Sequence, residues 1–561
     1  MKTLLLAFAL LAQAPSSLVP LKEAVRDFPR SQLQVKSGPV TTELKNGSRA
    51  GYETLATIAG LNIIFDADYR DTPIPPLRID SPDVLSAFDV LSMTTGNFVE
   101  VVASRTIVVA PNNATKRRDY EMQVLKTFYL PSGTSQQELN DAVTRLRTIA
   151  QARWVATSSL SNAIVIRDTP DRIALAEQTL AAAKSIISTS PVGTNAVGHE
   201  FIQDGATIRD LTPSRVALQS VQTSPQSFRI DGDSRTAFEN FAKDAGLNVV
   251  FDPDFRSVTV RFNVENVSLG GALDLLALQT RNFWEAIDNK TIIVAPDNQA
   301  KRRDYELQSA RVFYFPNSLQ QGLTEVITAL RTVLNLRYLA QVSGAGAIVI
   351  RDKANTMALA EKVINDIVSP VGSFSSVPEI PTGAEMGPIF ARRAARSLST
   401  VLSELQPKTT GLLSFDFNLS AARSFEALAD QAGVNIAFDR RFQDRPPMRF
   451  RVDGVDIFDA LDYLSLQTGN MWEIGDSSTI IVGPDNPAAW QDLSRRISKT
   501  IVLTRFPQQY LIEISTALRT LFNFRQLDAS GNTIAIVDTP YNIAIAERLV
   551  SDLDKPGGRI Q

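Results

Sequence analysis

The sequence predicts an α+β fold: a multidomain tandem repeat in which small two-helix/β-sheet domains alternate with domains of β-α-β-β-α order. One octapeptide occurs three times, as AGLNIIFD at 59–66, AGLNVVFD at 245–252 and AGVNIAFD at 432–439. The copies lie 245 − 59 = 186 and 432 − 245 = 187 residues apart, and so long a period indicates a whole repeated domain unit. Three such units nearly fill the 561 residues, whose 44% hydrophobic and 21% charged content is ordinary for globular protein.

Each octapeptide is predicted to join a helix to a strand. Upstream of every copy, apolar residues recur at i, i+3, i+4 and i+7, and this spacing gives a helix one apolar face. In the first unit these residues are Tyr52, Leu55, Ala56 and Ala59. A glycine that suits a left-handed C-cap follows each helix: Gly60, Gly246 and Gly433. The next residues are apolar and partly β-branched, so we expect a buried strand there.

A second helix and a β-rich segment complete the first half of each unit. The helix has apolar residues at i, i+4 and i+7, beginning at Val84, Leu269 and Ile457. It ends near TGNFVE, TRNFWE and TGNMWE, after which the β-rich segments begin at Thr106, Thr291 and Thr479. The first half of each unit is therefore predicted to be a compact α+β domain of about 75 residues.

The second half of each unit is predicted to have the order β-α-β-β-α. A strand leads into an amphipathic helix, which reads NDAVTRLRTI, TEVITALRTV and IEISTALRTL, and two strands and a last helix follow. The expected first-half domains are 38–113, 227–298 and 411–487, and the expected second-half domains are 114–187, 299–368 and 488–556. The segments 188–226 and 369–410 are richer in Gly, Pro and Ser and are predicted to be linkers. Within the second, Ile389 to Leu405 could form a basic amphipathic helix that docks on a neighbouring unit, with a membrane or partner site as the alternative.

The N-terminus predicts export. MKTLLLAFALLAQAPSS has a positive start, a short apolar core and a small-residue exit, so residues 1–17 are expected to be a signal peptide. No later stretch is long and apolar enough for a transmembrane helix. The chain contains no Cys, which excludes disulfides and thiolate chemistry, and this fits a bacterial periplasm. The net charge of −3 and a pI near 5.6 argue against nucleic acid as a partner.

The two halves together resemble the periplasmic N-terminal domains of the secretin family, the outer-membrane channels of secretion and type IV pilus systems. The first half looks like the short N-terminal domain shared by secretins and TonB-dependent signalling receptors, through the helix ending in AGLNIIFD, the helix before TGNF and the TIVVAP strand. The second half looks like the KH-like secretin N-domain, through KTFYLP, LRTI and IVIRDTPDRIALAEQTL. The resemblance implies three tandem copies of a short N-terminal domain followed by a KH-like domain.

The chain departs from the family in one respect. In a secretin the last N-domain leads into a long β-rich segment that forms the gated barrel, whereas this sequence runs from SDLDKPGGRIQ to Gln561. A membrane barrel needs many alternating strands of about ten residues, and the repeats leave none unassigned. We therefore expect no channel activity from this chain alone.

Catalytic chemistry is not predicted. The only histidine is His199, in a predicted linker, and one His without Cys cannot supply a zinc cluster or a Cys-His pair. The recurring carboxylates follow strands, where short polar side chains commonly bond to the turn backbone: Asp66, Asp252, Asp439, Asp168, Asp352 and Asp538. We expect a protein that is not an enzyme and has no cofactor or metal; a carboxylate-based cell-wall hydrolase would need an inward-facing carboxylate pair in a cleft.

Two basic triplets lie at the junction between the halves and are the candidate interaction residues: Lys116, Arg117, Arg118, Lys301, Arg302 and Arg303. The third unit keeps only Arg495 and Arg496 near this place. They would either form solvated or inter-domain salt bridges or contact an acidic partner.

The expected function is that of an exported, non-catalytic interaction scaffold in the bacterial periplasm, either free there or peripheral to the outer membrane, alongside protein secretion or type IV pilus machinery. The expected partners are a secretin channel, inner-membrane components of such a machine, or an anti-sigma-type regulator, and identical subunits could stack into a homo-oligomeric ring. The alternative is a periplasmic signal-relay module like that of TonB-dependent transducers.

Overall fold

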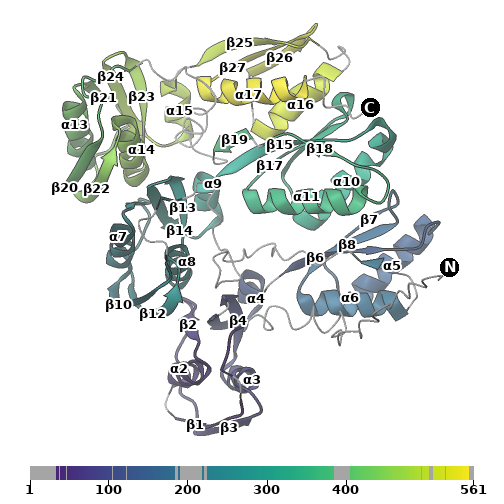
Figure 1. Cartoon of the computed structure of the whole chain (residues 1–561). Helices are drawn as coiled ribbons and strands as arrows, with labels where there is room; N and C mark the ends of the chain where they lie inside the picture. The colour runs from purple at the N-terminus through teal and green to yellow at the C-terminus, as the bar shows by residue number, and fades with distance from the viewer. Residues whose placement is uncertain are drawn as a thin grey trace, which may run out of the picture.

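The computed structural model describes residues 33–182, 188–189, 218–219, 224–383 and 405–554, apart from 37, 46, 104, 122, 379, 495, 505–509, 523 and 525. It contains three copies of a two-domain unit, which we call units 1, 2 and 3. The first domain of each unit is the two-helix domain and the second is the KH-like domain. Figure 1 shows the two-helix domains in one column and the KH-like domains in a second column beside it.

The two-helix domains have the same elements in the same order. In unit 1 they are β1 (Val40–Leu44), α2 (Ser48–Ala59), β2 (Asn62–Phe65), β3 (Leu77–Ser81), α3 (Val84–Thr95), β4 (Asn97–Ala103) and β5 (Thr106–Pro111). In unit 2 they are β10 (Gln226–Asp233), α7 (Ser234–Ala245), β11 (Asn248–Phe251), β12 (Thr259–Val267), α8 (Leu269–Thr280), β13 (Asn282–Asp288) and β14 (Thr291–Pro296). In unit 3 they are β20 (Leu413–Leu419), α13 (Ala421–Ala432), β21 (Asn435–Phe438), β22 (Met448–Val455), α14 (Ile457–Thr468), β23 (Asn470–Asp476) and β24 (Thr479–Pro484).

Two sheets enclose the helix pair of each two-helix domain. One sheet has three strands in the order β2-β5-β4, with β2 parallel and β4 antiparallel to β5, and the other is the antiparallel pair β1-β3. The corner between α2 and β2 is sharp because Gly60 ends the helix with φ 68°, a conformation that costs glycine little. Units 2 and 3 repeat both sheets.

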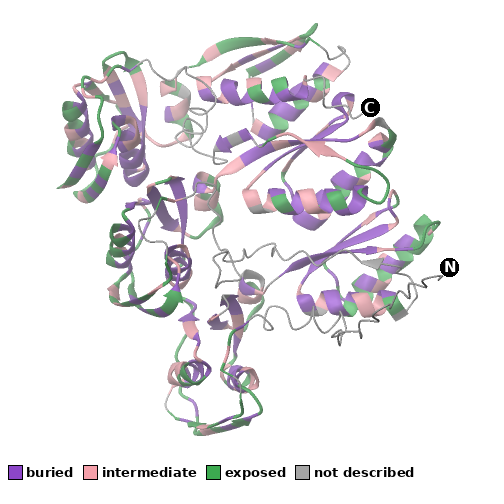
Figure 2. Ribbon diagram, in the orientation of Figure 1, coloured by how far each residue is buried: buried purple, intermediate pink, exposed green. Residues whose placement is uncertain are grey.

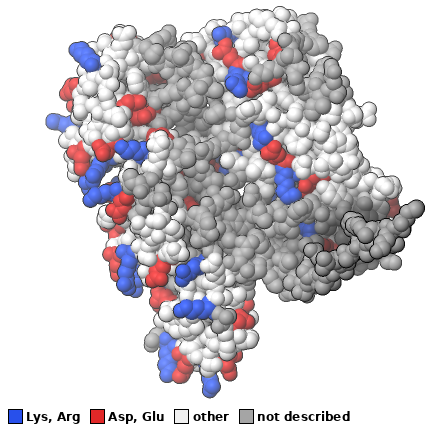
Figure 3. Space-filling view, viewed as in Figure 1, with Lys and Arg blue, Asp and Glu red and all other residues white. Residues whose placement is uncertain are grey.

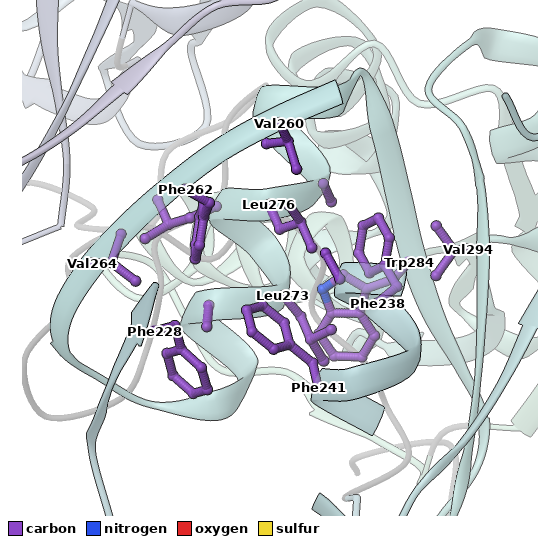
Figure 4. Close-up of a cluster of buried hydrophobic side chains, with 14 of the residues drawn as sticks. Phe228, Phe238, Phe241, Val260, Phe262, Val264, Leu273, Leu276, Trp284 and Val294 are labelled. Carbon is purple, nitrogen blue, oxygen red and sulfur yellow. The ribbon is translucent and has the colours of Figure 1, made fainter. Parts of the chain in front are cut away.

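Aromatic and aliphatic side chains from both helices fill the core between these sheets. In the two-helix domain of unit 2, Phe238 and Phe241 of α7 meet Phe262 of β12 and Leu273 and Leu276 of α8 (Figure 4). All five are at most 3% exposed. The apolar spacing of the two helices therefore describes the faces that meet in the core.

The KH-like domains also repeat, each after a short helix. Unit 1 has α4 (Ala114–Tyr120), β6 (Val124–Tyr129), α5 (Gln136–Thr148), β7 (Trp154–Ser158), β8 (Ala163–Asp168), α6 (Pro170–Ala182) and β9 (Ser188–Thr189). Unit 2 has α9 (Gln299–Tyr305), β15 (Gln308–Tyr314), η2 (Asn317–Gly322), α10 (Leu323–Leu334), β16 (Tyr338–Val342), η3 (Ser343–Ala345), β17 (Ala347–Asp352), α11 (Ala354–Val368), β18 (Ser375–Ser376) and β19 (Ile380–Gly383). Unit 3 has α15 (Pro487–Leu493), β25 (Ile497–Val502), α16 (Leu511–Phe522), β26 (Gln526–Ser530), β27 (Thr533–Asp538) and α17 (Pro540–Leu553).

Each KH-like sheet is antiparallel, with the last strand of the motif in the centre. The strand orders are β7-β8-β6-β9, β16-β17-β15-β18 and β25-β27-β26, and β19 also pairs with β15. The short strands β9, β18 and β19 lie inside the two segments that the sequence predicts as linkers, and they add to the edges of β6 and β15.

The structure confirms the α+β fold class with its repeated two-helix and β-α-β-β-α units. The sequence analysis did not foresee the strand that opens each unit, its partner between the two helices, or the short helices α4, α9 and α15. Two features predicted from sequence lie outside the described residues, namely the signal peptide 1–17 and His199. The predicted helix from Ile389 to Leu405 also lies outside them except for Leu405. Within the described part of the chain, none of the helices combines the length and the apolar character that crossing a bilayer requires.

Candidate functional site: the stacking surfaces of the units

The lysine of each basic triplet is bound to carboxylates of its own unit. Lys116 Nζ lies 2.7 Å from Asp66 Oδ2 and 3.0 Å from Asp68 Oδ2. Lys301 Nζ lies 2.8 Å from both Asp252 and Asp254. Burial disfavours the charged form of Lys301, but its hydrogen bonds and ion pairs with the two carboxylates outweigh burial and raise the pKa of this lysine.

The other residues of the triplets differ in their surroundings. Arg302 lies 2.6 Å from Asp297 and 2.5 Å from Glu306, and Arg117 lies 2.8 Å from Glu121. Arg303 is exposed, and the side chain of Arg118 is outside the described residues. A role of these six residues in binding a partner stays a prediction. Figure 3 shows acidic and basic side chains of the described residues lying close to one another over the two-helix column.

The recurring carboxylates bond to nearby backbone. Asp66 Oδ1 accepts from the Asp68 N–H at 2.7 Å, and Asp252 and Asp439 repeat this turn. Asp168 accepts from the N–H of Thr169, and Asp352 and Asp538 make the same contact with the residue that follows them. These contacts are the turn bonds expected from the sequence. Among the described residues, no group of three or more His, Asp or Glu side chains could hold a metal ion.

The two-helix domains stack through the asparagine of the first and second octapeptides. Asn62 Nδ2 donates to the Glu265 carbonyl oxygen at 3.2 Å, and its Oδ1 accepts from the Glu265 N–H at 3.0 Å. Asn248 makes the same two bonds with Asp453, at 3.4 and 2.9 Å. The sheet of one domain therefore docks on the outer strand of the next domain through the same contact at both junctions.

A β-bulge explains why these backbone groups are available. On β12, Glu265 and Asn266 together oppose Ser227 of β10, and on β22 Asp453 and Gly454 oppose Ser414 of β20. Asn266 and Gly454 have φ values of 54° and 63°. A bulge interrupts the ladder and leaves backbone groups that need another partner, and the asparagine amide satisfies them.

Apolar and charged contacts surround each asparagine. Ile64 of β2 is 1% exposed and belongs to the hydrophobic core of the unit 2 domain, as Val250 of β11 does to that of unit 3. Arg281 forms an ion pair with Asp68 at the first junction. At the second, the Tyr463 hydroxyl donates to Asp288.

The KH-like domains stack by laying a helix of one unit on the open sheet face of the preceding unit. Helix α10 lies on β7 and β8, and α16 lies on β16 and β17. At the first junction the Glu325 carboxylate accepts from the hydroxyls of Ser158 and Ser159 and from the Leu160 N–H. At the second, the equivalent Glu513 accepts from the Gly344 N–H at 3.1 Å.

A tyrosine and an aspartate repeat on the other side of this interface. The Tyr129 hydroxyl donates to the Asp366 carbonyl oxygen at 2.8 Å, and Thr127 donates to the carboxylate of the same aspartate. The Tyr314 hydroxyl donates to the Asp552 carbonyl oxygen at 2.6 Å. Burial, followed by the charge of Asp552, raises the pKa of Tyr314 above its ordinary value, so this phenol stays protonated and able to donate.

The two KH-like junctions differ in which partner supplies the bulky side chain. At the first, a Cβ on Gly322 would lie 2.8 Å from the side chain of Leu160. At the second, a Cβ on Gly344 would lie 2.1 Å from the ring of Tyr510. The bulky residue is thus on the sheet side at one junction and on the helix side at the other. This difference in shape favours the docking of each helix on the sheet of the unit that precedes it over docking on another sheet.

The sheet face of the last KH-like domain is polar where the preceding ones are apolar. By strand register, Ser498, Thr500 and Asp528 of unit 3 take the places of Ala310, Val312 and Ala340 of unit 2. The first three are exposed, whereas the alanines and the valine are at most 8% exposed. Figure 2 shows β25 mostly exposed at the end of the column. Polar outer faces are typical of terminal repeats, which must not stack further.

Comparisons with known proteins give a limited likeness. No model of a known protein family matches the chain, and no curated protein matches it. Among solved structures, the chain is similar to the N-terminal domain of the secretin XcpQ from Pseudomonas aeruginosa, at 17% identity over 26% of this chain and 67% of that one, with a TM-score of 0.11. It is also similar to a structure described as XcpQN012, at 18% identity over 27% and 68% of the two chains, with a TM-score of 0.12.

Proposed function

We propose that this chain is an exported, non-catalytic protein-protein interaction scaffold of the bacterial envelope, associated with protein secretion or type IV pilus machinery. The observation that carries the proposal is the repetition of the same docking contacts at both junctions, in both columns. Because equivalent faces of its domains bind other domains, the domain surfaces are suited to protein-protein interaction.

A non-catalytic role is supported by the state of the recurring carboxylates. Asp66 and Asp252 each accept from a turn N–H and pair with a lysine, and Asp439 pairs with Arg441 at 2.7 Å. A general acid or base needs to face a substrate, whereas these groups face their own turns.

The periplasmic location and the partner class rest on the sequence. The first 17 residues have the layout of a secretory signal, and the repeated phrases resemble secretin N-domains. We therefore place the partners among a secretin channel, the inner-membrane components of a secretion or pilus machine, and regulators anchored in the envelope.

Within this proposal the chain acts as a single stack of three units. The polar sheet face at Ser498 and Thr500 is one reason. At the opposite end, Arg145 of α5 stands where Ala329 and Ala517 stand in the repeated TALRT motif, and a long charged side chain hinders the close approach of helix to sheet. Neither end of the KH-like column matches the other, so a homo-oligomeric ring is disfavoured.

The test is a gene deletion in a bacterium that produces the chain, with secretion, piliation and transcription measured together. A scaffold of secretion or pilus machinery predicts a loss of export or pili that the wild-type gene restores. An unchanged envelope phenotype with altered transcription would instead support a signal relay and contradict the proposal.

A further inference from the structure

The third octapeptide carries the same asparagine as the other two, but within the described residues no further unit covers it. We propose that the sheet face of the unit 3 two-helix domain, centred on Asn435, docks a small α+β domain of a different protein that presents a bulged outer strand. This inference rests on the proposed scaffold function and deepens it by naming the face and the kind of partner.

The position of Asn435 repeats that of the two asparagines already engaged. Asn62 pairs with Thr106, Asn248 with Thr291 and Asn435 with Thr479, each as the first residue of a parallel strand pair. The same register places the amide at the same point of the sheet. Asn435 can therefore offer one N–H donor and one acceptor oxygen to a strand in the manner of Asn62.

The surroundings of Asn435 are open. Asn248 is 6% exposed because unit 3 covers it, whereas Asn435 and Ala437 are both exposed. Ala437 takes the place of Ile64 and Val250, and Gly483 that of Ala110 and Ala295. The face thus keeps the polar contact and has less apolar surface, which suits docking that is reversible, because buried apolar area is the main driving force of association.

A second copy of this chain does not fit the face. In unit 1 the equivalent outer strand, β3, pairs with β1 residue for residue from Val40 with Ser81 to Leu44 with Leu77. This pair has no bulge, so β3 lacks the element that Glu265 and Asp453 present to asparagine at the two junctions. The polar KH-like face at Ser498 would also meet α5 of a second copy.

The structural element that the partner must present follows from the junctions at Asn62 and Asn248. It must present a strand in which a residue with positive φ follows the docking residue, as Asn266 follows Glu265 and Gly454 follows Asp453. In both units a helix N-terminus comes within a few residues of the bulge, at Leu269 and Ile457. We therefore expect a strand–bulge–helix element in the partner.

The experiment uses the full chain, which contains no native Cys, so one introduced thiol can be labelled uniquely. The Ala437→Cys chain is purified, labelled with a maleimide-linked benzophenone, added to envelopes of cells that produce the chain and irradiated, and cross-linked peptides are identified by mass spectrometry. Met93→Cys and Ser498→Cys, on other exposed surfaces, serve as matched label sites. Circular dichroism verifies that each variant is folded.

The proposal predicts an adduct from Ala437→Cys on a strand–bulge–helix element of another protein. Adding Asn435→Ala should lower its yield by about thirtyfold, because two hydrogen bonds of about 1 kcal/mol each are lost, whereas adding Asn532→Ala should not. Three results would overturn the inference: adducts only from the other two sites, an adduct with a second copy of this chain, or an adduct on a different kind of element. Each of them would be compatible with the scaffold function. No adduct with another protein from any site would contradict both.

Discussion

Asn62 of unit 1 holds the backbone of Glu265 in unit 2 with both ends of its amide, across 203 residues of chain. The side chain behaves as one more peptide group that completes an interrupted ladder. Asn248 repeats the contact with Asp453. The docking contact therefore recurs with the same spacing as the sequence repeat.

Asn248→Ala should destabilise the second junction by about 1–3 kcal/mol, because it removes both hydrogen bonds that Asn248 makes with the Asp453 backbone. The measurement is chemical denaturation, together with hydrogen exchange at the Asp453 amide. Asn435→Ala is the matched control, since it changes the same residue in the same register at an exposed position, and it should shift stability by less than about 0.5 kcal/mol. Equal effects of the two substitutions would contradict the account of the junction.

Gly344→Ala should weaken the second KH-like junction by about 1–3 kcal/mol, because its Cβ would lie 2.1 Å from the Tyr510 ring. Tyr510→Ala in the same chain should relieve most of this cost, and a double-mutant cycle by denaturation measures the coupling. Gly270→Ala is the control, since a Cβ there meets nothing within 4 Å. An absence of coupling would show that the two residues do not pack together.

Acid should open the first KH-like junction. Burial disfavours the charged form of Glu325, but the hydrogen bonds from Ser159, Leu160 and Ser158 outweigh burial and lower the pKa of this carboxyl below its ordinary value of 4.5. A carboxyl with a lowered pKa in the folded state stabilises that state fully above its unfolded pKa, and this contribution is lost as the pH falls through the folded pKa. The protection factor of the Leu160 amide, which is the ratio of its intrinsic to its observed exchange rate, should therefore fall below about pH 4.5.

Two variants separate this effect from general acid unfolding. Glu325→Gln should already show fast exchange at Leu160 at pH 7 and little further change with acid. Asp141→Asn alters the equivalent position of unit 1, which is exposed, and should leave the Leu160 profile unchanged. A Glu325→Gln chain with the wild-type profile would refute the role of the carboxylate.

Lys301→Met should destabilise unit 2 by about 3 kcal/mol, because it leaves the buried Asp252 carboxylate without its cation. Thermal and urea unfolding monitored in the full chain give the value. Arg303→Met changes an exposed residue of the same helix and should have little effect. If the two variants are equally stable, the ion pair contributes nothing measurable.

The repeat and the local corners could be predicted from the sequence because both depend on nearby residues. The spacing of Tyr52, Leu55, Ala56 and Ala59 describes one helix face, and Gly60 ends that helix in the conformation expected. The stacking could not be predicted in the same way, because Asn62 meets a residue in another unit and the bulge at Asn266 has no strong local signal. One clue was present: a polar asparagine recurs at the start of an otherwise apolar strand.

The basic triplets illustrate the other difficulty. Lys116 and Lys301 are noticeable in the sequence as clustered charge, yet their partners are the Asp66 and Asp252 carboxylates, about 50 residues earlier in the chain. Sequence reasoning assigned a turn role to these aspartates and considered the lysines separately, because the short helices α4 and α9 that bring them together were not foreseen.

The most direct test of the central claim, that the stacking surfaces are used within one chain, is the molar mass of the purified chain by light scattering across a concentration series. The account predicts a constant value at or just below the 61.4 kDa of the full sequence. A defined oligomer that forms with increasing concentration and is lost with Asn248→Ala would show that the same surfaces join separate chains, and would contradict it.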